Sequence, residues 1–74
     1  MIGQEELGTR FTYHAPHGDQ VERYQDIREH AKAFATLIDR HCPDSREKAL
    51  ALTELESSVM WANAGIARRD PQEA

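Results

Sequence analysis

The segment RYQDIREHAKAFATLI, residues 23–38, decides the fold class of this chain of 74 residues. Its apolar side chains recur at alternating spacings of three and four, so they fall on one stripe of a helix. The stripe consists of Tyr24, Ile27, Ala31, Phe34 and Ile38. We predict a helix over residues 19–41 that packs through this stripe, because Pro43 disfavours helical backbone in the residue before it.

A second segment, ALTELESSVMWANAGIARR, residues 51–69, repeats the same spacing. Its stripe consists of Leu52, Leu55, Val59, Ala62 and Ile66. The pattern predicts a helix over residues 44–69, which Asp70-Pro71 ends before a polar tail at residues 71–74.

Two matched stripes joined by a short loop favour an antiparallel two-helix hairpin over residues 19–70. Such a hairpin pairs Tyr24 with Ile66 and Ile38 with Leu52. The fold class is therefore all-α, and the end of the second helix lies beside the start of the first.

An acidic residue stands at the start of each predicted helix, and a glutamate follows it three positions later. We expect Asp19 and Asp44 to accept hydrogen bonds from backbone N–H groups of the first turns. Residues 1–18 show no sustained period and are broken by glycine and proline, so they predict an irregular or briefly helical N-terminal arm.

The small size of the chain predicts self-association. A domain of this length buries too little apolar surface to be comfortably stable alone. The single cysteine, Cys42, cannot form an internal disulfide, and the histidines lack a zinc-finger spacing. Met60 and Trp61 lie outside the second stripe among small alanines, which suits close contact between helices of different chains. We therefore expect a compact homo-oligomer.

The charge balance limits the classes of partner. Nine Lys and Arg residues against 13 Asp and Glu residues leave a net charge of −4, which disfavours duplex nucleic acid as a partner. No apolar run is long enough to span a bilayer, and the first residues lack the features of a signal peptide. We expect a cytoplasmic protein with no membrane partner, and a reduced thiol at Cys42.

The pairing of the helices brings Arg68 and Arg69 near the segment FTYHAPHGD, residues 11–19. Helix-start amides and arginines bind phosphate, and aromatic faces stack on bases. The candidates contributed by the arm are Phe11, Tyr13 and His14. A structural interpretation stays open for each group, since the aromatic rings would also cover the open end and the arginines would also complement the helix dipole.

Three further polar residues have two interpretations each. Arg28 and Lys32 lie one turn apart on the flank of the first helix. They form either a solvated face of that helix or ligands for phosphate. Asn63 lies in an apolar stretch, where an amide fixes the register of packed helices or contacts a ligand. The chain shows no acid/base pair, phosphate loop or closed metal site, so we expect no catalytic residue, metal or cofactor.

The segments FTYHAP, residues 11–16, and the two helical segments quoted above together resemble the phage anti-CBASS sponges, whose hairpin domain is shared with phage anti-Thoeris proteins. VMWANAGIAR, residues 59–68, and the F-x-Y-H-x-P entry are the most specific parts. The resemblance implies a homohexamer built as a trimer of dimers, with ligand sites between chains. It also implies binding of cyclic dinucleotides and, at separate sites, cyclic trinucleotides, without cleavage, in the cytoplasm of the infected bacterial host.

The resemblance also implies roles for individual residues. Tyr13 would stack on a base, and Arg28, or Lys32 in its place, would contact phosphate. The trinucleotide site would be lined by Asn63, Ala67, Arg68 and Arg69. The alternatives are a helical scaffold that binds a protein through the Trp61 face, a relative that prefers cyclic ADP-ribose-type signals, and, third, a nuclease-type enzyme.

Overall fold

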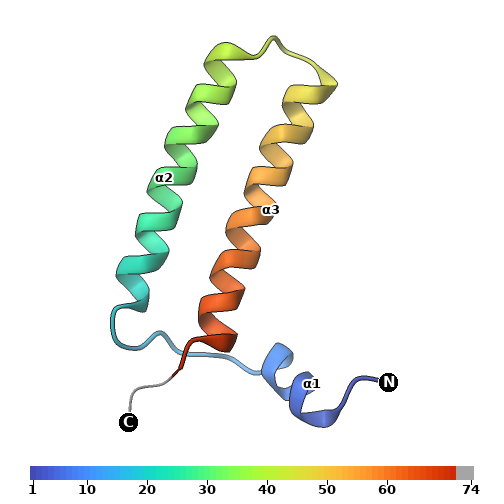
Figure 1. Ribbon diagram of the computed structural model, residues 1–74, viewed down its shortest axis with the longest axis vertical. Coiled ribbons are helices and arrows are strands. Elements are labelled where there is room, and N and C mark those ends of the chain that lie inside the picture. Colours follow the sequence, from blue (N-terminus) through green and yellow to red (C-terminus); the bar gives the residue numbers. More distant parts are fainter. Residues whose placement is uncertain (72–74) are drawn as a thin grey trace.

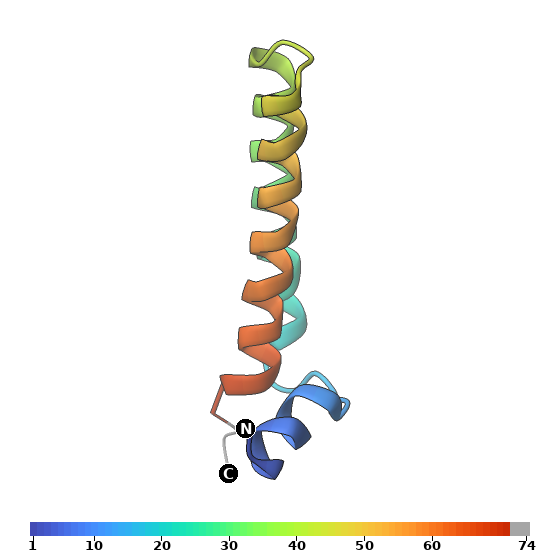
Figure 2. The ribbon, with the colours of Figure 1, turned by 90° about the vertical axis from the view of Figure 1, so that its right-hand side faces the viewer.

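The computed structural model describes residues 1–71, which form three α-helices and no strand. They are α1 (Gln4–Phe11), α2 (Gln20–His41) and α3 (Arg46–Arg69). The helices α2 and α3 run antiparallel beside each other, and α1 lies at the end of the hairpin opposite the α2–α3 loop (Figure 1). Figure 2 shows that the hairpin is one helix thick, in agreement with a shortest dimension of 14 Å. The predicted all-α class is confirmed.

The N-terminal arm contains a regular helix over residues 4–11, which agrees with the briefly helical alternative of the two that the sequence left open. Acidic residues occupy the first turn of α1 and Arg10 its last turn, which complements the helix dipole. The Arg10 Nε donates to the Glu6 carboxylate at 2.8 Å, one turn away. Such pairs of charges give no apolar period, which is why the sequence did not set the bounds of this helix.

The start of α2 differs from the predicted cap. The Asp19 side chain bonds no backbone N–H, and its carboxylate accepts from Arg23 Nε at 3.0 Å. Instead, His17 and Gln20 exchange two hydrogen bonds, Gln20 N–H to the His17 carbonyl and His17 N–H to Gln20 Oε1, both at 3.1 Å. Gly18 lies between them at φ 56°, a left-handed conformation that favours glycine.

The start of α3 also differs, because Ser45 and not Asp44 is the cap. Ser45 Oγ accepts from the backbone N–H of Lys48 at 3.1 Å. Asp44 instead accepts from Lys48 Nζ at 2.9 Å, and the same ammonium contacts Asp39 Oδ1 at 2.8 Å. Lys48 therefore ties the end of α2 to the start of α3.

The packed stripes differ from the predicted ones at one position on each helix. Phe34 is 55% exposed, and Ala35 is the half-buried residue at that level. On α3, Ala62 is exposed and Asn63 is half-buried. The other predicted stripe positions are half-buried. At about 100° per residue, Phe34 and Ala35 lie about equally far on either side of the stripe centre, as Ala62 and Asn63 do, so the spacing alone did not decide between them.

The two long helices bury very little apolar side-chain surface between them. Among residues 1–71 no apolar side chain is fully buried, and Gln20 is the one residue of the buried class, at 2% exposure. Met60 and Trp61 are 65% and 72% exposed. None of the helices within this range has the length and apolar character needed to cross a membrane. Residues 72–74 of the predicted polar tail lie outside the described part.

Candidate functional site

A cleft of about 360 Å³, here called the arm cleft, lies at the open end of the hairpin. The arm and α1 contribute Arg10, Thr12, Tyr13 and His14. The two long helices contribute Tyr24, Arg28, Asn63, Ala64, Ala67 and Arg68. The cleft thus joins side chains from all three helices and from the connection between α1 and α2.

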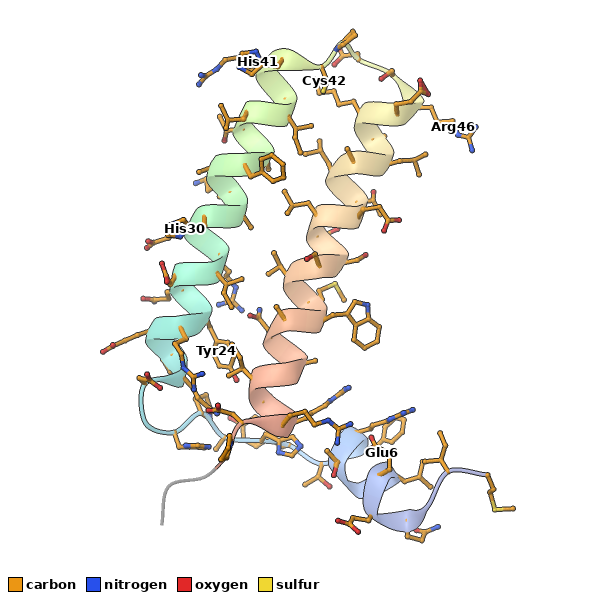
Figure 3. The ribbon with its side chains drawn as sticks, in the orientation of Figure 1. Glu6, Tyr24, His30, His41, Cys42 and Arg46 are labelled. Atoms are coloured by element: carbon orange, nitrogen blue, oxygen red, sulfur yellow. The ribbon has the colours of Figure 1, made fainter. Side chains whose placement is uncertain are left out.

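Helical spacing explains which side chains of α2 and α3 meet in the arm cleft. Tyr24 and Arg28 are four residues apart and share one face of α2, as Asn63 and Ala67 do on α3. Tyr24 lies between the two helices near their open end (Figure 3). The short Ala67 side chain leaves space on the α3 side of the cleft.

The arm is held in place by a local hydrogen bond. The Nε2 atom of His14 lies 2.7 Å from the Thr9 carbonyl oxygen, so His14 turns the chain back onto the end of α1. Tyr13 beside it is 83% exposed. The Tyr13 ring is therefore free to stack on a planar group that enters the arm cleft.

Asn63 brings an unpaired acceptor to the same cleft. Its Oδ1 atom is buried and has no hydrogen-bond partner within residues 1–71. A buried amide oxygen without a partner costs roughly 1–3 kcal/mol, which a donor from a ligand or a second chain would recover. This observation agrees with either of the two predicted roles of Asn63, because a donor is needed in both.

A second cleft of about 450 Å³, the tryptophan cleft, lies next to the arm cleft. It is lined by Arg10, Phe11, Trp61, Ala64, Gly65, Arg68 and Arg69. Phe11 and Trp61 are 82% and 72% exposed, and the two small residues between the arginines and the indole leave room for a flat group. Arg10 and Arg68 line both clefts.

Glu6 neutralises part of the charge of the tryptophan cleft. Both carboxylate oxygens of Glu6 lie 2.9 Å from Arg69 Nη2, and one of them accepts from Arg10 Nε at 2.8 Å. Hydrogen bonds from Arg69 and then from Arg10 hold the pKa of Glu6 below its ordinary value. The hydrogen bond to Glu6 raises the pKa of Arg69 in turn.

A polar clamp closes the hairpin beneath the arm cleft. Gln20 Nε2 donates to the Ile66 carbonyl at 3.3 Å and to Asp70 Oδ2 at 3.1 Å. Arg23 also binds the Asp70 carboxylate through both of its terminal nitrogens. Hydrogen bonds from Arg23 and then Gln20 lower the pKa of Asp70. The clamp holds the end of α3, and with it Arg68, against the start of α2.

The structure brings most of the predicted site residues together. The arm cleft gathers Tyr13, His14, Arg28, Asn63, Ala67 and Arg68, and the tryptophan cleft contains Phe11 and Arg69. Lys32 is separate from both, in a shallow groove halfway along the hairpin beside Ala31, Leu55 and Val59. Of the two basic residues of α2 that the sequence left as alternatives, only Arg28 therefore lines the arm cleft.

Sequence reasoning missed four residues that line the arm cleft, which are Arg10, Thr12, Tyr24 and Ala64. Arg10 lies in the last turn of α1 and Thr12 directly follows this helix, whose bounds the sequence did not set. Tyr24 was assigned to the packing stripe, although its position one turn before Arg28 was a usable signal. Within residues 1–71, no group of three or more His, Cys, Asp or Glu side chains is arranged to hold a metal ion.

Comparison with known proteins gives one positive result. No curated protein and no solved structure matches the chain. The family model described as Acb2/Tad1, hairpin domain, matches residues 4–67. This span begins with α1 and includes the arm, α2 and nearly all of α3. The resemblance found in the sequence is confirmed, and the chain belongs to the Acb2/Tad1 hairpin-domain family.

Proposed function

We propose that this protein is a non-catalytic sponge that sequesters cyclic oligonucleotide second messengers and so blocks bacterial anti-phage signalling. The observation that carries the proposal is the arm cleft, which gathers three arginines, an exposed tyrosine and Asn63, whose buried amide oxygen has no partner within residues 1–71. Membership in the family supports a sponge role in anti-defence. The site of action is the cytoplasm of the infected host.

The chemistry of the arm cleft matches the parts of a nucleotide. Arg28 and Arg68 are suited to phosphodiester oxygens, because guanidinium groups bind such oxygens through charge-assisted hydrogen bonds. Tyr13 offers a ring face for a base. The Asn63 side-chain oxygen is a hydrogen-bond acceptor, so its partner on the ligand must be a donor, such as the exocyclic amine of adenine. A sponge needs affinity and no turnover, so this set of groups is sufficient.

The ligands we propose are cyclic dinucleotides at Tyr13 and Arg28, and cyclic trinucleotides at a separate site. The second site would use Asn63, Ala67, Arg68 and Arg69, of which the first three also line the arm cleft, so the two sites adjoin each other. Three-fold repeats in a ligand suit a site on a symmetry axis, where each chain supplies the same arginine once.

We also propose that the protein assembles as a homohexamer, a trimer of dimers, through the face that carries Trp61. The exposed indole and Met60, together with the lack of any buried apolar side chain in residues 1–71, support association. Gly65 and Ala64 beside Trp61 allow the backbones of two helices to approach closely.

Calorimetric titration with cyclic dinucleotides, cyclic trinucleotides and cyclic ADP-ribose tests the proposal. We expect Arg28→Gln to weaken cyclic dinucleotide binding about tenfold or more, because a hydrogen bond to a charged phosphate is lost. Arg46→Gln is the matched control, since Arg46 lies at the loop end of the hairpin (Figure 3). Equal affinities for the two variants would contradict the assignment of Arg28.

The same titrations separate the alternatives. A response to cyclic ADP-ribose alone would favour a relative that captures that class of signal. No response to any of these ligands would favour a helical scaffold that uses the exposed Trp61 face. Recovery of the intact ligand after heating the complex would exclude a nuclease, and native mass spectrometry would give the size of the assembly and its occupancy.

A further inference from the structure

The arginines that line the two clefts differ in whether a protein carboxylate neutralises them. Arg69 and Arg10 are both held by the carboxylate of Glu6, at 2.9 Å and 2.8 Å. Arg28 and Arg68, in the arm cleft, form no salt bridge within residues 1–71. Arg10 and Arg68 line both clefts, so the clefts differ in Arg69, which Glu6 neutralises, and in Arg28, which no carboxylate within residues 1–71 neutralises.

We propose that Glu6 is a specificity-determining residue that weakens the binding of ligand phosphate at Arg69, in the tryptophan cleft, relative to Arg28 in the arm cleft. A phosphodiester carries one negative charge, so replacing the Glu6 carboxylate at Arg69 exchanges one anion for another with little electrostatic gain. At Arg28 and Arg68 no protein carboxylate has to be displaced. This inference rests on the proposed function, because it concerns where the sponge holds its ligand.

Glu6 lies where a ligand anion can compete with its carboxylate for Arg69. Its side chain is 31% exposed and the Arg69 side chain 57%, so solvent and solutes reach the pair. Within residues 1–71, the hydrogen bonds from Arg69 to Glu6 are the only side-chain hydrogen bonds between α1 and α3. An anion that displaces Glu6 must therefore also release α1 from the end of α3, which adds to the cost of binding in the tryptophan cleft.

Trp61, the single tryptophan of the chain, reports on this cleft directly. The probe is inorganic pyrophosphate, which does not absorb the excitation light of the indole. We expect Glu6→Gln to bind pyrophosphate about two- to fivefold more tightly than the original chain, as followed by Trp61 fluorescence. Glu5→Gln is the matched control, because it changes the net charge equally on the same helix.

Two further measurements make the test decisive. Adding Arg69→Gln to the Glu6→Gln chain is expected to reduce the gain, and sedimentation at the same concentration checks that assembly is unchanged. Equal pyrophosphate affinity in Glu6→Gln and Glu5→Gln, or weaker affinity in Glu6→Gln, would overturn the inference. Failure of the original chain to bind any cyclic nucleotide in calorimetry would instead overturn the proposed function.

Discussion

Replacing Gln20 by methionine removes the centre of the clamp at the open end and keeps the length of the side chain. Gln20 is 2% exposed and makes three hydrogen bonds, to His17, Ile66 and Asp70. Water does not reach the site to replace them, so each lost bond costs about 1 kcal/mol, and the one to the carboxylate costs more. We expect Gln20→Met to lower the free energy of unfolding by about 2–4 kcal/mol.

This loss is large for a domain of 74 residues, whose total stability is of order 4–11 kcal/mol. The unfolding midpoint should fall by roughly 10 °C or more. Urea unfolding followed by circular dichroism, at equal chain concentrations, measures the effect. Gln25→Met on the exposed side of α2 is the matched control. If both variants lose the same stability, the clamp does not hold the hairpin closed and the argument from burial is refuted.

Two further predictions concern Asp70 and Tyr13. Because Arg23 and Gln20 lower the pKa of Asp70 from 3.8, the ionised carboxylate stabilises the folded chain above that pH, and this stability is lost as the pH falls through the lowered value. Acid unfolding curves should therefore be flatter for Asp70→Asn than for the original chain, and parallel curves would count against the clamp. Tyr13→Ala should weaken cyclic dinucleotide binding about tenfold in calorimetry and leave the sedimentation coefficient unchanged; loss of assembly instead would make Tyr13 a packing residue.

Local spacing was sufficient to predict the two long helices and their antiparallel pairing. The 3-4 pattern is a property of contiguous residues, and two complementary stripes can bury each other in only a few ways. The same pairing correctly predicted that Arg68 lies near the aromatic arm. Family membership was also evident from the quoted segments.

The tertiary structure alone decided which polar groups meet. The contacts from Arg69 to Glu6 and from Gln20 to Asp70 join residues 63 and 50 positions apart. Contacts between residues so far apart follow no periodic pattern in the sequence, because the residues meet only when the arm and the two helices have packed together. The sequence by itself therefore determined the hairpin and the class of ligand-binding groups. The fold determined that Arg28 faces the arm cleft, that Lys32 does not, and that Glu6 neutralises Arg69.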